Sequence, residues 1–226
     1  IKNGNNYFGE WVQLTYPMVN NWSNGQLLTH DGYVYVIGGY SSSGVYNTAL
    51  WRYNIETNLW ESKATFVGGR IDFACGLVNN KIYVIGGANA SGNQRGVSCY
   101  DIATDTWSAK TAIYPTNNVK SYDSCTVNNK IYIIGGKPLS VAVNYNYIYN
   151  PITDAFENGA SRPAGIYAAA TFVMDDTNII SAMGQTPENT PTDVVYKFNT
   201  VANTWDSGIP PVTPEKLANV KAVTIN

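Results

Sequence analysis

Short runs of β-branched and aromatic residues recur along the chain, and each run ends at glycine. Three of them span Tyr33 to Gly39, Ile82 to Gly87 and Ile131 to Gly136, and a less regular fourth spans Ile179 to Gln185. No segment keeps apolar residues at helical spacing for more than two turns. The pattern therefore predicts an all-β chain of short strands.

The runs recur with a period close to 49 residues. Taking Gly184 as the first glycine of the fourth copy, the first glycines are Gly38, Gly86, Gly135 and Gly184. A second series, of large aromatic residues, keeps the same period: Trp11, Trp60, Trp107, Phe156 and Trp205. Each of the last four follows another aromatic by seven residues: Tyr53, Tyr100, Tyr149 and Phe198. Three series with one period indicate a structural repeat.

Each repeat contains four extended segments joined by short polar turns such as Asn79-Asn80, and asparagine suits the positive φ angles of such turns. A four-stranded unit of this size cannot bury both faces, so the units are expected to stack radially and share their faces. The large aromatic residue should fill the space between adjacent units. Because Gln185 replaces a second glycine, we expect a differently shaped loop in the fourth unit.

The strand ending in Gly-Gly, the following Tyr and the Trp seven residues later closely resemble the kelch repeat, which builds β-propellers. The resemblance covers nearly the whole chain. It implies an all-β propeller whose blades are four-stranded antiparallel sheets, with the innermost strand of each blade lining a central channel.

We interpret residues 1–226 as a single kelch propeller domain or a fragment of one, with an unfinished ring. The complete blades are expected at about 18–65, 66–114, 115–161 and 162–209, with a partial strand at 7–15 and a partial blade at 213–226. Since propellers usually close their rings and so remove exposed sheet edges, we expect the chain to be part of a longer protein. The alternative is a homo-oligomer in which chains complete one another.

The charge balance excludes several classes of partner. The 226 residues include 14 Lys and Arg against 16 Asp and Glu, so the formal net charge is −2. Nucleic acids and anionic membranes usually require an excess of positive charge. The longest apolar run, around Tyr167 to Met174, is also far shorter than a membrane span. We therefore expect a soluble protein with no nucleic-acid or membrane partner, and its compartment stays open.

Catalytic chemistry is restricted because the chain has one histidine, His30, which excludes every mechanism that needs two imidazoles. The three cysteines, Cys75, Cys99 and Cys125, have no metal-ligand spacing and are expected to be buried free thiols. No metal site, no cofactor and no catalytic residue is predicted.

Turns within units and loops between units should lie at opposite ends of the blades. The turns carry acidic residues, namely Asp31, Glu56, Asp105, Asp154, Asp175 and Asp176. The loops are expected to carry the cations Lys63, Arg70, Arg95, Lys110, Lys120, Lys137, Arg162 and Lys216. The small net charge can therefore hide one acidic and one more basic end, and an even scatter of solvated charge is the alternative.

Candidate binding residues are cations and aromatic residues near the channel mouth at the loop end. Exposed rings stack on a ligand while a cation binds its anionic group, which suits acidic peptides or sugars that bear a carboxylate. The candidates are Trp22, Tyr40, Arg70, Arg95, Lys120, Tyr122, Lys137, Arg162, Tyr167 and Lys216. The alternative is that the aromatic residues only pack the channel wall.

Two functions remain open. The first is a kelch binding module that recognises a protein or peptide partner, with acidic side chains, through the loops between blades. The alternative is a propeller that binds a sialic-acid-like sugar at the central channel, or acts on it as a mutarotase of similar fold. In that case Arg70 or Arg162 would hold the carboxylate and Asp72 or Asp123 would exchange a proton. No spacing singles out these residues, so the sequence favours binding and leaves enzymatic activity open.

Overall fold

The computed structural model describes residues 22–66, 68–116, 119–138 and 141–209, and every regular element within them is a β-strand. The expected partial strand at 7–15, the partial blade at 213–226 and Lys216 lie outside the described residues. Sixteen of the strands form four antiparallel four-stranded sheets, in which strands adjacent along the chain are also neighbours in the sheet. The all-β blade architecture predicted from the repeat is confirmed.

The four sheets, called blades 1 to 4, each place their first strand innermost and their last outermost. Blade 1 contains β2 (Gln26–His30), β3 (Tyr33–Ile37), β5 (Leu50–Asn54) and β6 (Leu59–Lys63). Blade 2 contains β7 (Ala74–Val78), β8 (Lys81–Ile85), β11 (Gly96–Asp101) and β12 (Thr106–Ile113). Blade 3 contains β14 (Asp123–Val127), β15 (Lys130–Ile134), β17 (Asn146–Asn150) and β18 (Ala155–Asn158). Blade 4 contains β19 (Ala170–Val173), β20 (Asn178–Ala182), β21 (Val195–Asn199) and β22 (Thr204–Ile209).

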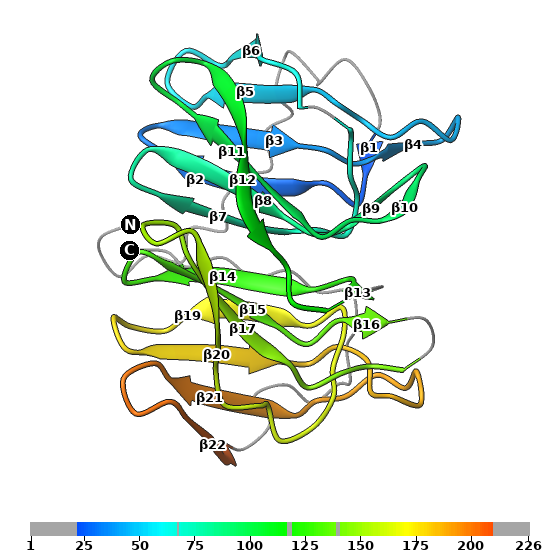
Figure 1. The fold of residues 1–226 in the computed structure, drawn as a ribbon, viewed down its shortest axis with the longest axis vertical. Coiled ribbons are helices and arrows are strands. Elements are labelled where there is room, and N and C mark those ends of the chain that lie inside the picture. The colour runs from blue at the N-terminus through cyan, green and yellow to red at the C-terminus, as the bar shows by residue number, and fades with distance from the viewer. Residues whose placement is uncertain (1–21, 67, 117–118, 139–140, 210–226) are drawn as a thin grey trace, which may run out of the picture.

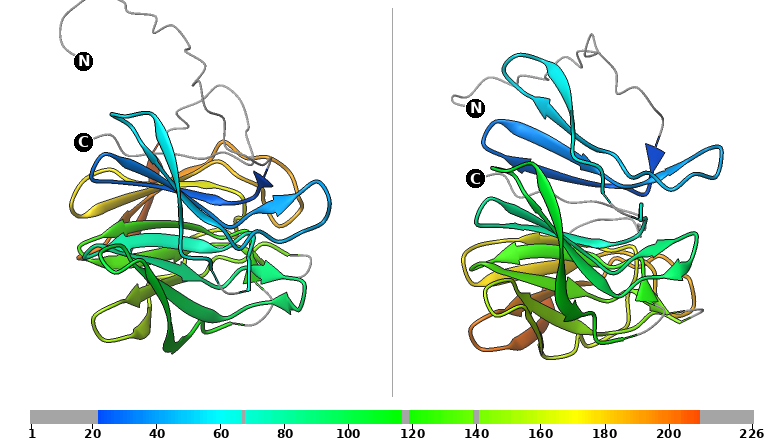
Figure 2. Two further views of the ribbon diagram at one scale, coloured as in Figure 1. Left: turned by 90° about the horizontal axis from the view of Figure 1, so that it is seen from above. Right: turned by 45° about the horizontal axis from the view of Figure 1, so that its top comes forward.

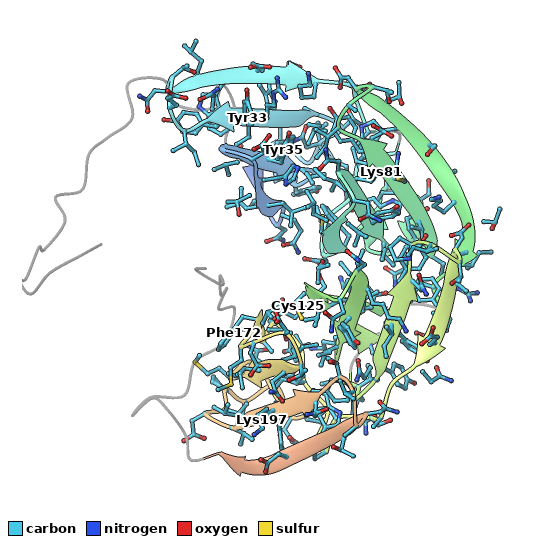
Figure 3. All side chains as sticks on the ribbon, turned by 90° about the vertical axis from the view of Figure 1, so that its left-hand side faces the viewer. Tyr33, Tyr35, Lys81, Cys125, Phe172 and Lys197 are labelled. Carbon is cyan, nitrogen blue, oxygen red and sulfur yellow. The ribbon has the colours of Figure 1, made fainter. Side chains whose placement is uncertain are left out.

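The blades lie side by side in a curved row (Figures 1 and 2), and Figure 3 shows this row along the channel, with the innermost strands on its concave side. The hydrophobic core lies between adjacent blades. Tyr83 of β8 packs against Tyr149 of β17 with ring centroids 5.7 Å apart, and Tyr132 of β15 packs against Phe198 of β21 at 6.0 Å. Each blade therefore buries its apolar faces against its neighbours, as the size of a single unit requires.

The turns between first and second strands have the predicted backbone. Asn79 and Asn80 have φ angles of 50° and 57°, and Asn128 and Asn129 have 49° and 58°. Two successive positive φ angles define the type I′ hairpin turn, which matches the twist of the strands that it joins. His30, at the end of β2, contacts Asn80 of the next blade through its Nε2 atom at 2.8 Å.

The glycine pair ends each second strand where the next blade comes close. A Cβ atom on Gly38 would lie 2.5 Å from the carbonyl oxygen of Arg70, so only glycine fits there. In blade 4 the predicted register is wrong by one residue. Met183 occupies the first position with a φ of 59° and Gly184 the second with 96°, matching 71° and 105° at Gly135 and Gly136. Gln185 thus follows the pair rather than replacing its second member.

The seven-residue aromatic spacing reflects direct cross-strand pairing between the third and fourth strands. Tyr100 and Trp107 are register partners with ring centroids 5.1 Å apart, and the equivalent pairs in the other blades are separated by 4.9 to 5.0 Å. Trp107 also packs against Phe66, which follows blade 1, and its indole N–H donates to the carbonyl oxygen of Ala64 at 2.8 Å. The tryptophan therefore fills the space between blades, as predicted.

A hydrogen-bonded contact that we call the interblade clasp joins the outer parts of adjacent blades. The carboxylate of Asp105, in a turn of blade 2, accepts the backbone N–H of Ala64 at 2.8 Å and the hydroxyl of Tyr100 at 2.7 Å. Asp154 repeats it in blade 3, accepting from Thr111 N–H and the Tyr149 hydroxyl, both at 2.8 Å. One turn side chain thus binds its own blade to the preceding one.

The clasp varies where the repeat varies. In blade 4 the turn residue is Asn203, which accepts the N–H of Ala160 at 2.8 Å, and Phe198 has no hydroxyl to add.

The predicted separation of cations from acidic turns is wrong for Lys63, whose ammonium lies 3.3 Å from the Asp105 carboxylate. The reason is that the outermost strands run around the periphery toward the next blade's turn (Figure 3). Lys110 likewise lies in outer strand β12 and not in a loop.

The clasp predicts coupled and pH-dependent stability. Burial alone would raise the pKa of Asp105, but hydrogen bonds from Ala64, Tyr100 and Lys63 hold it below the ordinary value of 3.8. A lowered pKa means that the carboxylate stabilises the fold above pH 3.8 and that this contribution disappears as the pH falls through the folded-state pKa. Denaturant unfolding of Tyr100→Phe, Asp105→Ala and the double variant should give a coupling free energy of about 1 kcal/mol at neutral pH.

The control for this cycle is the equivalent pair in blade 1, where the Tyr53 hydroxyl donates to the amide oxygen of Asn58 at 2.6 Å. An amide does not titrate, so coupling between Tyr53→Phe and Asn58→Ala should not change with pH, whereas that of the Tyr100–Asp105 pair should fall in acid. If the two coupling free energies depended equally on pH, the pH dependence could not be assigned to the Asp105 carboxylate.

Candidate functional site

The loops that connect the blades gather at one end of the molecule, which we call the loop rim. There the segment before each innermost strand pairs with the segment after the glycine pair. The ladders are β1 (Trp22–Ser23) with β4 (Tyr40–Ser41), β13 (Val119–Lys120) with β16 (Lys137–Pro138), and single bridges between Ile71 and Ala88 and between Tyr167 and Gln185. A small hairpin of β9 (Ala88–Asn89) and β10 (Gly92–Asn93) extends from blade 2. Figure 1 shows these short strands together on the right.

A chain of backbone contacts joins the four blades along the channel mouth at this rim. Four equivalent residues, Asn24, Asp72, Ser121 and Ala168, have φ angles of 50° to 59°. The N–H of each of the last three donates to the carbonyl oxygen of the one before, at 3.3 to 3.5 Å. Such left-handed backbone is uncommon for residues other than glycine. The rim loops of adjacent blades are thereby held in one register around the mouth.

Arg70 lies within blade 2 and not on the rim surface where the sequence placed it. Its side chain is 8% exposed, and one terminal nitrogen donates to the carbonyl oxygens of Gly86 and Gly96 at 3.2 and 2.9 Å. Burial lowers the pKa of Arg70. The guanidinium therefore holds the ends of two strands together.

Arg162 lies in the loop between blades 3 and 4, as predicted, but at 1% exposure it is buried and not accessible as a rim binding residue. Its Nε donates to Ser181 at 3.1 Å, one terminal nitrogen donates to the carbonyl oxygen of Ala164 at 2.9 Å, and the guanidinium lies 4.4 Å from the ring centre of Tyr196. Burial lowers the pKa of Arg162 to about 10. Both arginines bind carbonyl oxygens of the chain itself.

The predicted aromatic residues differ in how far they are buried. Tyr122 is 3% exposed and packs edge-on against Tyr114 with ring centroids 4.9 Å apart, so it belongs to the core. Tyr40 is half-buried and packs against Tyr46 at 5.0 Å. Trp22 lies in β1 of the rim, where its backbone pairs with Ser41.

Lys137 and Tyr167 come together at the rim between blades 3 and 4. The Lys137 ammonium lies 4.4 Å from the ring centre of Tyr167, 3.4 Å from its hydroxyl and 2.5 Å from the side-chain oxygen of Asn189. The Tyr167 hydroxyl donates to side-chain oxygens of Gln185 and Asn189. Gln185 and Asn189 were not predicted, and only their place in the fourth glycine loop could have suggested them. This network holds Lys137 in one position.

Lys120 lies directly opposite Lys137 in the β13–β16 ladder. Opposite residues of an antiparallel pair point to the same face, with Cβ atoms about 5 Å apart, and like charges there repel. Lys120 is exposed. Arg95, on the loop of blade 2, is half-buried and donates to the carbonyl oxygens of Tyr114 and Pro115 at 2.7 and 3.1 Å.

Most cations on the blades form ion pairs, whereas Lys110 of β12 and the cations on the rim form none within the described part of the chain. Five cations form ion pairs with carboxylates of the blades: Arg52 with Glu61, Lys63 with Asp105, Lys81 with Asp101, Lys130 with Glu157 and Lys197 with Asp206. Arg95, Lys120 and Lys137 make no ion pair with any described residue. The rim thus presents three positive charges without an internal counter-ion among the residues that the structure describes.

The innermost strands line a cavity of about 790 Å³. Side chains of β2, β7, β14 and β19 form its wall, and Cys125 and Phe172 lie on the concave side in Figure 3. Cys75, Cys99 and Cys125 are free thiols; Cys75 and Cys99 are buried, as predicted, and Cys125 is half-buried. Burial raises the pKa of Cys75 and Cys125 well above the usual value, so these thiols stay protonated.

In the described part of the chain, no group of three or more His, Cys, Asp or Glu side chains is placed to hold a metal ion. Nor does this part contain a helix of the length and apolar character needed to cross a membrane.

A family model for the KLHDC2/KLHL20/DRC7 Kelch-repeats domain matches residues 24–222. This chain belongs to the kelch-repeat family. Among solved structures, the kelch domain is similar to YjhT, with a TM-score of 0.77 and 18% sequence identity, covering 91% of this chain and 70% of that one. At this identity the likeness shows a common fold.

Curated relatives carry the same repeats. Kelch repeat and BTB domain-containing protein 2 of cowpox virus (strain Brighton Red) is 27% identical over 181 residues, covering 78% of this chain and 26% of that protein. Its counterpart in ectromelia virus (strain Moscow) is 28% identical over 92 residues, covering 41% and 16%. Human kelch repeat and BTB domain-containing protein 8 is 35% identical over 102 residues, covering 39% and 17%. The kelch domain thus spans about a sixth to a quarter of the length of these relatives.

The lysine pair of the kelch domain predicts a gain in stability when one charge is removed. Lys120→Gln should raise the free energy of unfolding by about 0.2–1 kcal/mol at low salt, because it ends the repulsion from Lys137. The gain should shrink at high salt, where the charges are screened. Lys110→Gln, which removes a charge from outer strand β12, is the matched control and should change little. Loss of stability in Lys120→Gln would mean that Lys120 makes a stabilising contact.

Proposed function

We propose that this kelch propeller binds an acidic segment of a partner protein at the loop rim, through Arg95, Lys120 and Lys137 with the ring of Tyr167 beside them. Kelch-repeat propellers are in general protein-interaction modules, and relatives that combine kelch repeats with a BTB domain point to protein partners. The observation that carries the proposal is that three cations without a carboxylate partner among the described residues lie on the rim, two of them directly opposite each other, whereas Lys110 is such a cation on an outer strand.

The rim supports binding because its groups are held before a partner arrives. Lys137 is fixed by Asn189 and Tyr167, and Arg95 by two backbone carbonyls. A fixed donor loses less conformational freedom on binding than a mobile one. The proximity of Lys120 to Lys137 adds to this, because a bound carboxylate would relieve the repulsion between the two ammonium groups. An acidic stretch of a partner chain provides several such carboxylates at once.

The binding proposal can be tested with peptides selected on the immobilised chain from a random display library. Selected peptides should be enriched in Asp and Glu, and their affinity should fall as salt rises. Lys120→Glu combined with Lys137→Glu should weaken binding by about tenfold or more, since it replaces two attractive charges by repulsive ones. Fluorescence anisotropy of one labelled peptide measures the dissociation constant of each variant.

The matched control is Lys110→Glu, which makes the same charge change on outer strand β12 and should leave affinity within about twofold. Selected peptides without acidic residues, or equal weakening by Lys110→Glu, would overturn the proposal. If N-acetylneuraminic acid binds instead and no peptide is selected, carbohydrate recognition takes the place of protein binding.

A further inference from the structure

The wall of the central cavity combines oxygen acceptors with apolar side chains. Its polar members near the loop rim are Gln26 of β2, Asp123 of β14 and Thr171 of β19. These residues follow the mouth residues Asn24, Ser121 and Ala168 by two or three positions, so at about 3.3 Å per residue they lie about 7–10 Å inside the mouth. Gln26 and Asp123 occupy equivalent positions of their blades, and Thr171 lies one residue deeper in the channel.

Thr171 has a hydroxyl that the described part of the protein does not use. The residue is only 5% exposed and lines the cavity, yet its Oγ1 atom has no hydrogen-bond partner among the described residues. A buried hydroxyl without a partner costs stability. The equivalent residue of blade 3, Ser124, does use its hydroxyl, donating to the carbonyl oxygen of Cys75 at 3.0 Å. The Thr171 hydroxyl is therefore a buried group without a hydrogen-bond partner among the described residues, on a residue that lines the cavity.

The charge of the wall indicates what kind of ligand suits the cavity. Asp123, Asp175 and Asp176 line the cavity, and no lysine, arginine or histidine is among the described residues that line it. The amide nitrogen of Gln26 donates to the carbonyl oxygen of Phe73 at 2.9 Å, which leaves the amide oxygen as its accepting atom. A ligand that donates hydrogen bonds and carries positive charge complements these groups.

We infer that the channel binds a primary ammonium group on a short alkyl chain, which donates to Asp123 and Thr171 on the adjacent innermost strands β14 and β19. The apolar side chains of Leu28, Leu77 and Phe172, which also line the cavity, would contact the alkyl chain. Two sources share this chemistry. One is a lysine side chain of a partner bound at the rim, inserted through the mouth, and the other is a free alkyl amine. The inference does not depend on rim binding.

The test uses n-butylammonium, the end of a lysine side chain, with n-butanol as the neutral probe of the same shape. In methyl NMR titrations of the whole chain, butylammonium should shift the Thr171 methyl signal in a saturable way and butanol should not. Asp123→Asn should weaken amine binding by about tenfold or more, because it removes the charge at the site. Thr171→Val keeps the shape of the side chain and should weaken binding about two- to tenfold.

Asp176→Asn is the matched control. It removes a carboxylate from the other end of the cavity, where the Asp176 backbone carbonyl accepts a hydrogen bond from Asn128, and it should change amine affinity much less than Asp123→Asn. Unfolding curves for each variant separate loss of binding from loss of fold, with Thr171→Val serving if Asp123→Asn does not fold. Equal shifts with butanol, or binding unaffected by both Asp123→Asn and Thr171→Val, would overturn the inference.

The two sources are distinguished by the rim-binding peptides. If a selected peptide contains lysine and competes with butylammonium for the Thr171 signal, the source is a partner side chain. If the peptides do not compete, a free amine is the ligand. Lys120→Glu with Lys137→Glu should weaken peptide binding by about tenfold or more without weakening the amine titration, so failure at the rim and failure in the channel can be told apart.

Discussion

Contact between adjacent blades is the constraint on which the structure depends, because no single four-stranded sheet can bury its own faces. The contact has an apolar part, in which aromatic rings of neighbouring blades pack together, and a polar part, the interblade clasp. In the clasp, Asp105 accepts hydrogen bonds from Tyr100 of its own blade and from Ala64 of the preceding blade. One carboxylate thus fixes both the turn that carries it and the position of the neighbouring sheet.

The rim cations take no part in the interblade clasp. Most cations of the blades are used internally: five form ion pairs with carboxylates, while Arg70 and Arg162 bind backbone carbonyls from buried positions. Arg95, Lys120 and Lys137 remain as rim charges without a carboxylate partner among the described residues. Behind them, the described channel wall carries carboxylates and no cation. The described rim therefore carries three cations without an ion pair, and the described channel wall behind it carries carboxylates.

The repeat predicted the fold well because its signals are local. The spacing predicted four-stranded antiparallel units, and the Tyr–Trp interval of seven residues proved to be a cross-strand pair. The register of Met183 and Gly184 was missed, because a methionine in the left-handed region is rare and a motif search assigns such positions to glycine. The burial of Arg70 and Arg162 was missed because it depends on carbonyl groups brought near by the fold. Which charges are neighbours likewise depends on the three-dimensional fold. The sequence could therefore place Lys120 and Lys137 in rim loops but could not show that they face each other.

The most direct measurement of the central claim is lysine acetylation footprinting of the whole chain with and without a selected acidic peptide. If the rim is the binding surface, the peptide should protect Lys120 and Lys137 from acetylation and leave Lys110 unchanged, because Lys110 lies on outer strand β12. Protection of Lys110 with unchanged labelling of Lys120 and Lys137 would contradict binding at the rim and place the partner on the outer strands.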